Sequence, residues 1–269
     1  MTLGTGNAAD DPRVAIKPAN MPGLFITGTG TDVGKTMATA ALAGALTGLG
    51  VNVGICKPVA TGCRPRGAGR PSMPPGDDDY DAPDAELAAR AAGLSTDAAM
   101  LRYLSPLRFV APTAAYVSAR MEGRAIHYQR IADAMEYWRS HCDFLLVEGA
   151  GGFLAPIDDS PFVIADLAVQ LALPLLVVTG IRLGTLNDTL LTVEAIRRRG
   201  LKLAGLVLNC IPEHTDLTMG CNIQDLPRFS QTPVVAALPE VKQWDHHTIP
   251  PELVDACTPF ARQFIGQQR

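Results

Sequence analysis

The sequence predicts an α/β protein with a doubly wound, mostly parallel sheet in a three-layer arrangement. Apolar runs of strand length alternate with helical segments, as they do in successive βαβ units. The run Phe144-Leu-Leu-Val is apolar throughout, which suits a parallel strand covered on both faces. The first run leads directly into a glycine-rich loop and an alanine-rich segment. We therefore expect a single domain over residues 21–269.

The expected elements follow one another in regular alternation. Strands are predicted at 23–28, 51–56, 143–148, 175–179, 203–209 and 233–238. Helices are predicted at 36–49, 84–93, 126–140, 162–173, 186–199 and 251–269. The last helix places Leu253, Cys257, Phe260 and Phe264 at helical spacing. Its polar face is not strongly basic, so we expect it to pack on the core and not on a membrane surface.

Composition excludes several classes of protein. The 269 residues carry a formal net charge of −4, whereas nucleic-acid-binding domains usually carry a clustered basic excess. The six cysteines include no C-x-x-C pair, so neither a zinc site nor a disulfide framework is indicated, and a cytoplasmic location fits best. No stretch of about 18 apolar residues is present to span a membrane.

Two segments are expected to lie outside the packed domain. Residues 1–20 lack the basic start and apolar core of a secretory signal, and we interpret them as a flexible tail. Residues 64–83 are rich in proline, glycine and charge, which predicts a long surface insertion. Residues 104–119 are too irregular to assign beyond a loop that enters a helix.

The glycine-rich loop has the residue types of a phosphate-binding loop, or P-loop. Its glycines let backbone N–H groups turn toward phosphate oxygens, its lysine reaches the β- and γ-phosphates, and its threonine offers a hydroxyl to Mg²⁺. Five residues separate the bracketing glycines instead of the usual four, so the loop is a variant. The candidate nucleotide-binding residues are Gly28, Thr29, Gly30, Thr31, Asp32, Val33, Gly34, Lys35 and Thr36. The fold is therefore expected to be P-loop NTPase-like.

Further polar residues follow other predicted strands, at the edge where open α/β sheets place ligands. Lys57 follows the second strand. A lysine there is more often solvated or salt-bridged when taken alone, but its position beside the phosphate loop favours a role in the site. Glu148 ends a buried strand, from which P-loop enzymes hold Mg²⁺, and ordinary turn chemistry is the alternative. Asp84 could cap a helix, hold Mg²⁺ or do both.

Five segments, present in one order along the chain, resemble the motifs of a known family. They are Gly28-Thr-Gly-Thr-Asp-Val-Gly-Lys-Thr, Lys57-Pro-Val-Ala-Thr-Gly, Asp84-Ala, Ala111-Pro-Thr and Val147-Glu-Gly-Ala-Gly-Gly. From about residue 23 to residue 240 the chain resembles the dethiobiotin synthetases, whose loop has the same five-residue gap. The resemblance implies a cytoplasmic homodimer that uses MgATP and CO₂ to close a ureido ring on 7,8-diaminopelargonic acid. The implied intermediates are a carbamate and a carbamic-phosphoric anhydride.

The resemblance also implies a role for particular residues. Lys35 would contact the ATP phosphates, and Thr36, Asp84 and Glu148 would hold Mg²⁺. Thr31, Asp32, Lys57 and Thr61 would surround the diamine and its carbamate, beside Gly149 after the third strand. Asn209 matches an asparagine that contacts adenine, and Pro239 lies near it. The substrate carboxylate would meet the backbone of Gly184 to Asn187 across the dimer, because a helix N-terminus suits an anion.

The chain departs from the family pattern at three places. Gly30 replaces a usual aspartate, Ala114-Ala-Tyr116 replaces a run that usually contains proline or histidine, and residues 64–83 lengthen the connection to Asp84. This insertion makes Asp77 to Asp79 and Asp81 competitors for the metal. We prefer Asp84, because it alone is followed by alanine and a helix.

Two other classes of protein share parts of this pattern. Amide-forming synthetases of the cobyrinic-acid type normally carry a glutaminase domain, for which one domain over residues 21–269 leaves no room. Partitioning ATPases that act on DNA or membrane carry an additional lysine near the start of the phosphate loop. Residues 28–33 contain no lysine.

Overall fold

The computed structural model describes residues 12–66, 80–214 and 216–268. Its centre is a six-stranded sheet in the order β10-β9-β8-β1-β7-β2, in which neighbouring strands run parallel. The strands are β1 (Gly23–Gly28), β2 (Val53–Cys56), β7 (Phe144–Glu148), β8 (Leu175–Gly180), β9 (Leu203–Ile211) and β10 (Val234–Pro239). The predicted parallel α/β fold is confirmed.

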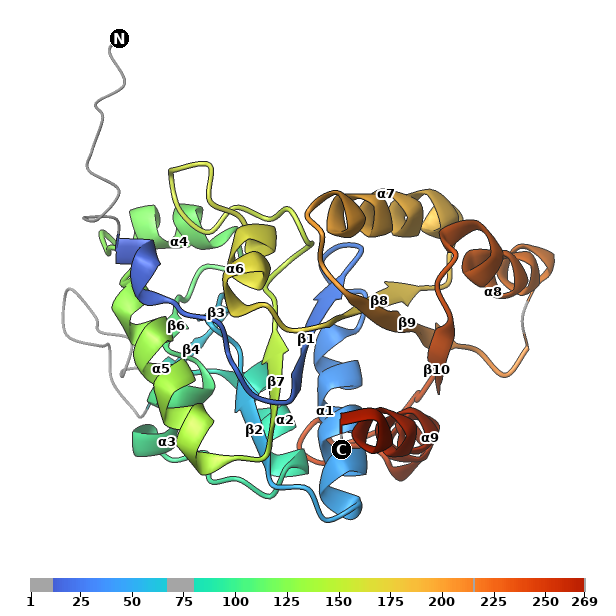
Figure 1. Ribbon diagram of the computed structural model, residues 1–269, viewed down its shortest axis with the longest axis horizontal. Coiled ribbons are helices and arrows are strands. Elements are labelled where there is room, and N and C mark those ends of the chain that lie inside the picture. The colour runs from blue at the N-terminus through green and yellow to red at the C-terminus, as the bar shows by residue number, and fades with distance from the viewer. Residues whose placement is uncertain (1–11, 67–79, 215, 269) are drawn as a thin grey trace, which may run out of the picture.

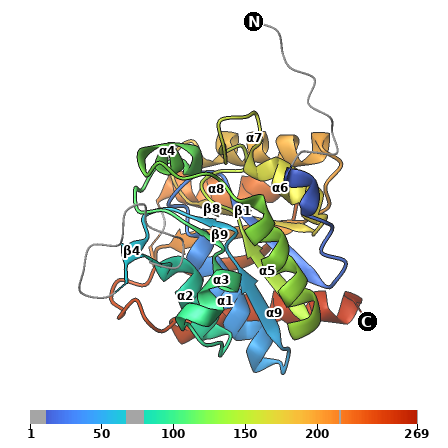
Figure 2. The same cartoon turned by 90° about the vertical axis from the view of Figure 1, so that its left-hand side faces the viewer.

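Helices cover both faces of this sheet, so that the molecule has three layers (Figure 1). On one face, α1 (Lys35–Gly48) packs against α9 (Pro251–Gln268); on the other, α7 (Thr185–Arg198) packs against α8 (Leu217–Ser230). Figure 2 shows the same two layers from the side. The other helices are α2 (Pro83–Ala91), α3 (Ala98–Leu104), α4 (Ala115–Met121), α5 (Tyr128–His141) and α6 (Ile164–Leu171).

Small residues in α1 allow α9 to approach closely. A Cβ atom added at Gly44 would lie only 3.1 Å from Cγ2 of Val254 in α9. Phe260 and Phe264 of α9 are buried, and the Phe264 ring meets Phe144 of β7 edge-on, with 6.0 Å between ring centroids. The expectation that the last helix packs on the core is confirmed.

The expected N-terminal tail differs from the structure in its second half. Residues 1–11 lie outside the described residues, but residues 12–20 pack against the domain after a 3₁₀ turn, η2 (Pro12–Ala15). Ile16 and Ala19 are 4% and 1% exposed, and the Ala19 N–H donates to the Leu171 carbonyl at 2.9 Å. The prediction that all of residues 1–20 form a flexible tail was wrong, because Ile16 and Ala19 are buried against the core.

The predicted insertion is also narrower than residues 64–83. Residues 67–79 lie outside the described residues. On either side of them, β4 (Arg64–Pro65) pairs antiparallel with β5 (Tyr80–Asp81), and α2 already begins at Pro83. Tyr80 and Ala82 are 2% and 1% exposed. The end of the segment therefore belongs to the packed domain.

Several elements were not predicted. The segment left unassigned at residues 104–119 contains β6 (Leu107–Arg108), which pairs in parallel with β3 (Val59–Ala60), and then enters α4. Helices α3 and α8 were also missed. Each begins after an aspartate whose side chain accepts a backbone N–H, namely Asp97 and Asp216. Among the described residues, no helix is long and apolar enough to cross a membrane.

We predict that Gly54 of β2 tolerates no side chain. An added Cβ would lie 2.5 Å from the Cys142 sulfur and 2.7 Å from Cε3 of Trp138. Overpacking of this kind costs about 1–3 kcal/mol, so Gly54→Ala should lower the free energy of unfolding by about that amount in urea denaturation.

The matched control is Gly48→Ala, because Gly48 is exposed and an added Cβ there meets no atom within 4 Å. The free energy of unfolding should then change by no more than about 0.5 kcal/mol. Equal effects of the two substitutions would contradict the packing described for β2.

Candidate active site

The candidate site lies where three neighbouring strands end. The register of the parallel sheet aligns Ile26 of β1 with Glu148 of β7, and Val147 of β7 with Cys56 of β2. Their carboxyl ends therefore meet at one edge, with the phosphate loop after β1 and Lys57 directly after β2. On the other side of β1 lies β8, so the chain order reverses at β1. This is the topological switch point at which open α/β sheets bind ligands.

The phosphate loop is tightly folded on itself. Gly34, just before α1, has φ +94°, and a Cβ atom there would lie 1.9 Å from Nδ2 of Asn209. Both the backbone and the neighbouring amide therefore require glycine. Asp32 also has a left-handed backbone, with φ 57°. Lys35 reaches back across the loop, and its Nζ donates to the Gly30 carbonyl at 2.7 Å.

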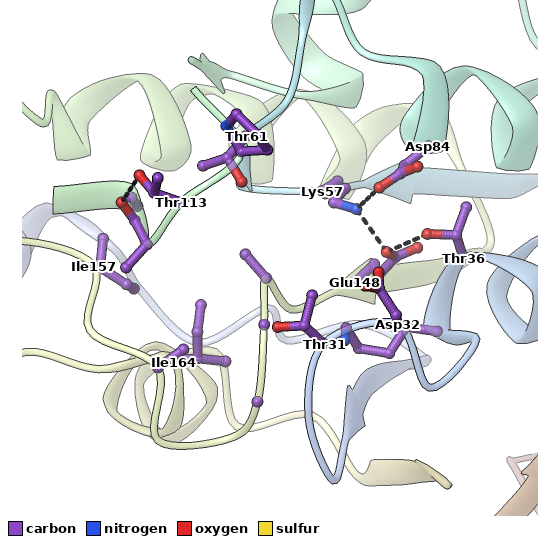
Figure 3. Close-up of a pocket in the computed structure, with 18 of the residues that line it drawn as sticks. Thr31, Asp32, Thr36, Lys57, Thr61, Asp84, Thr113, Glu148, Ile157 and Ile164 are labelled. Carbon is purple, nitrogen blue, oxygen red and sulfur yellow. Dashed lines mark hydrogen bonds and ion pairs between the residues drawn. The ribbon is translucent and has the colours of Figure 1, made fainter. Parts of the chain in front are cut away.

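A cluster of charged groups lies beside this loop, buried at Lys57 and Glu148 and open to solvent at Asp84, whose side chain is 52% exposed (Figure 3). Lys57 Nζ donates to Oε1 of Glu148 at 2.8 Å and to Oδ2 of Asp84. The Thr36 hydroxyl donates to the same Glu148 oxygen at 2.8 Å. Lys57 is 6% exposed and Glu148 2% exposed. The cluster thus joins residues from α1, α2 and the ends of β2 and β7.

Burial and charge act in opposite directions on the two lysines. For Lys35, burial is the largest effect and lowers the pKa of the ammonium, although Glu148 opposes it. Burial would also lower the pKa of Lys57, but the carboxylates of Glu148 and Asp84 together outweigh it and raise that pKa above the usual lysine value. Lys57 is therefore held as an ammonium ion.

The oxygen atoms around Lys57 fit a magnesium ion chemically. The carboxylates of Asp84 and Glu148 converge on one cationic group, and the Thr36 hydroxyl joins them. Mg²⁺ prefers such oxygen ligands and usually takes only one or two carboxylates, with water and phosphate completing its shell. Among the described residues, no group of three or more His, Cys, Asp or Glu side chains could hold a metal.

The structure distinguishes Asp84 from Asp81, the other candidate magnesium ligand among the described residues. Asp84 lies in the first turn of α2, where Ala82 is the N-cap residue, and its side chain contacts Lys57 instead of capping the helix. Asp81 instead forms an ion pair with Nε of Arg66 at 3.0 Å and does not line the cavity. Asp77 to Asp79 lie outside the described residues.

A cavity of about 690 Å³ opens in front of the charged cluster. One end is polar and contains Thr31, Asp32, Lys35, Thr36, Lys57, Thr61, Asp84 and Glu148, all of which were predicted. The other end is mainly apolar and contains Pro112, Ala114, Ala115, Ala155, Pro156, Ile157 and Ile164, with Thr113 on the same side of the cavity (Figure 3). In Figure 3, Ile157 and Ile164 lie on the side of the cavity away from Lys57. The cavity therefore suits a ligand with a polar head and an aliphatic body.

Other predicted residues lie beside the cavity lining or away from it. Gly34 is in the lining, whereas Gly28, Thr29, Gly30, Val33 and Gly149 are not. Asn209 packs against Gly34 at the end of β9, and Pro239 is exposed at the end of β10. Asn187 is exposed in the first turn of α7.

The apolar end of the cavity was missed by sequence reasoning. Ile157 and Ile164 flank the polar turn at residues 158–160, so that no periodic pattern marks either as part of a site. The weak signal available was an apolar residue isolated between Pro156 and Asp158.

Fold and site together define a P-loop NTPase-like α/β protein. Solved structures with this fold include the cell division ATPase MinD of Pyrococcus furiosus, with a TM-score of 0.54 and 17% identity over 93% of this chain and all of that one. The MinC:MinD complex of Aquifex aeolicus gives a TM-score of 0.53 at 14% identity, over 91% of this chain and 96% of that chain. At these identities the similarity concerns the fold alone.

Sequence comparison identifies the family. Residues 22–248 match the family model described as an AAA domain. The chain is 42% identical to the ATP-dependent dethiobiotin synthetase of Streptomyces coelicolor, over 81% of this chain and 84% of the relative. It is 39% identical to that of Anaeromyxobacter sp., over 82% and 92% of the two chains. The chain belongs to the dethiobiotin synthetase family.

We predict that the Lys57 ammonium stabilises the folded state through Glu148. Lys57→Gln would leave the 2% exposed carboxylate of Glu148 without its buried cation, and breaking such a pair costs about 3 kcal/mol. Urea denaturation should record a loss of that order. The control is Lys242→Gln, which removes an exposed lysine and should have almost no effect. Equal stability of the two variants would contradict the buried ion pair.

Proposed function

We propose that the protein makes dethiobiotin by closing a ureido ring on 7,8-diaminopelargonic acid with CO₂ and MgATP. The observation that carries this proposal is the combination, in one cavity, of a phosphate loop, two buried lysines and an apolar end. The substrate combines a diamine head with an aliphatic chain, which correspond to the polar end and the apolar end of the cavity. Membership in the dethiobiotin synthetase family supports the same reaction.

The residues of the polar end would act in three steps. A free amine of the substrate attacks CO₂ and releases a proton to solvent, which gives a carbamate whose negative charge would be stabilised by the Lys57 ammonium. A carbamate oxygen attacks the γ-phosphorus of ATP, which releases ADP, while Lys35 stabilises charge on the transferred phosphoryl group. The second amine then attacks the anhydride carbonyl, the ring closes and phosphate leaves. Thr31, Asp32 and Thr61 border this space and would orient the two amines.

Magnesium would be held by Thr36, Asp84 and Glu148, the oxygen ligands that surround Lys57. When bound, it would neutralise charge on the β- and γ-phosphates of ATP. Glu148 would both hold magnesium and position Lys57, because one of its oxygens accepts hydrogen bonds from Thr36 and Lys57.

The remaining roles concern the nucleotide base, the substrate tail and assembly. Asn209, which packs against the phosphate loop, and Pro239 would contact adenine. Gly149 would act on the substrate by placing the small residues that follow it, Ala150 to Gly152, which line the cavity. In a cytoplasmic homodimer, the start of α7 would receive the substrate carboxylate from the neighbouring subunit. Asn187 is exposed there and Leu183 is 84% exposed, as residues of a subunit contact would be in a single chain.

The decisive experiment is ATP turnover with and without the proposed substrates. We expect ADP and dethiobiotin to form together only when diaminopelargonic acid, bicarbonate and MgATP are all present. Lys35→Ala should lower this turnover by about 10²–10³ while the fold is retained, because it removes a cation from the transferring phosphoryl group. Turnover and circular dichroism would be measured on the same samples.

The contrary outcomes are equally specific. ATP turnover that is independent of the diamine and responds to DNA or lipid vesicles would favour a partitioning-type ATPase. Wild-type turnover by folded Lys35→Ala would exclude the role proposed for that lysine.

We also predict that Asp84, and not Asp81, determines the magnesium requirement. Asp84→Asn should raise the Mg²⁺ concentration for half-maximal turnover by about tenfold, because one charged ligand becomes a neutral amide. Asp81→Asn is the matched control, since that carboxylate pairs with Arg66 outside the cavity lining. The same magnesium titration should be unchanged in this variant. The assignment fails if the two variants respond alike.

A further inference from the structure

The segment before β1 is attached to the domain along its length. We call residues 12–20 the N-terminal strap; it contacts α5 through η2 and appears in dark blue beside α5 in Figure 1. Nε of Arg139 in α5 donates to the Ala19 carbonyl at 3.1 Å. From α6, Gln170 donates through Nε2 to the Arg13 carbonyl at 3.2 Å. The strap is thus fixed to both helices.

One side chain of the strap reaches the loop between β7 and α6. Nη1 of Arg13 donates to Oγ of Ser160 at 2.8 Å, and its guanidinium lies over the Phe162 ring, 5.3 Å from the centroid. Guanidinium groups both donate hydrogen bonds and pack on aromatic faces, which makes arginine suited to such a joint. Arg13 therefore connects the strap to residues 156–163, which we call the wall loop.

The wall loop is a closed turn held from its other side by α5. Its base is closed by a bridge between Pro156 and Val163, with the Ile157 N–H donating to the Phe162 carbonyl at 3.0 Å. At its tip, the Ser160 hydroxyl and the hydroxyl of Tyr128 in α5 both donate to Asp158. A continuous chain of hydrogen bonds therefore runs from Arg13 through Ser160 and Asp158 to Tyr128.

The wall loop also forms part of the apolar end of the active-site cavity. Pro156 and Ile157 belong to its base and line the cavity, and Ile164 follows immediately in α6. The Ile157 side chain is fully buried, so it is placed by the loop that carries it. Arg13 does not line the cavity. Its side-chain contacts with Ser160 and Phe162 connect it to the cavity through the wall loop.

We infer that Arg13 is a positioning residue, which holds the wall loop so that Ile157 and Ile164 accommodate the aliphatic chain of the substrate. This inference rests on the proposed function, since it assigns the apolar end to the chain of the diamine. The phosphate loop lies between β1 and α1, where Lys35 bonds within the loop and Thr36 bonds Glu148, whereas the strap is bonded to α5, α6 and the wall loop. Loss of Arg13 should therefore weaken binding of the diamine and leave ATP binding unchanged.

The first arm of the test measures the loop without reference to substrate. Hydrogen–deuterium exchange of the wall loop should be faster in Arg13→Ala than in the wild type, while exchange of β1 and α1 is unchanged. Lys17→Ala is the matched control, because Lys17 is an exposed cation of the same strap. It should leave exchange of the wall loop at the wild-type rate.

The second arm measures kinetics on the same proteins. In Arg13→Ala, KM for diaminopelargonic acid should rise about three- to tenfold, the effect of losing one hydrogen bond and one cation–π contact, with kcat and KM for ATP unchanged. Arg13→Lys keeps a donor and a charge and should recover part of the loss. Lys17→Ala should match the wild type.

The outcomes separate the inference from the proposed function. Unchanged hydrogen–deuterium exchange of the wall loop in Arg13→Ala would show that Arg13 does not hold this loop. Faster exchange with an unchanged KM for the diamine would overturn the positioning role. Equal losses for diamine and ATP would indicate general destabilisation and also overturn it. A wild-type protein that does not consume the diamine would contradict the proposed function, and the exchange arm would still decide whether Arg13 holds the loop.

Discussion

The site is organised around one buried ion pair, that between Lys57 and Glu148. Removing both charges from water is costly, and the pair persists because the Thr36 hydroxyl and the Asp84 carboxylate complete its hydrogen bonds. The parallel register of β2 and β7 brings Lys57 and Glu148 together, while α1 places Thr36 and α2 places Asp84. The sheet therefore positions the two residues, and the ion pair between them keeps both side chains charged at the edge of the cavity.

The same arrangement explains how an anionic protein binds anionic ligands. Net charge is −4, yet both buried lysines face one cavity beside backbone N–H groups of the phosphate loop. Positive potential is concentrated where phosphate and carbamate charge would develop, and it does not need a basic surface. In the proposed function, the apolar end of the cavity would add a second kind of selectivity, for a substrate with an aliphatic body.

Local sequence signals predicted the parallel sheet and three charged residues at its edge, and the family resemblance added Thr31, Asp32 and Thr61. Buried strands of a parallel sheet are apolar at nearly every position, and the residues that follow them lie at one edge. The sequence alone therefore predicts that Lys35, Lys57 and Glu148 lie together. The missed helices carry weaker signals: α8 contains Pro227 and buries little of its surface. The apolar wall was missed because Ile157 and Ile164 meet the cavity only through tertiary folding of a short loop.

The close packing of α1 against α9 has a consequence for the order in which the site is completed during synthesis. All six strands of the sheet precede α9, so a growing chain can contain the whole sheet and the phosphate loop before Pro251 is added. At that stage the face of α1 at Gly44 lacks Val254 and the apolar residues behind it. The helix that presents the loop's amide groups to phosphate thus gains its final neighbour late. Ribosome-bound chains must pass through a state in which the nucleotide-binding segment exists but its supporting helix is still incompletely covered.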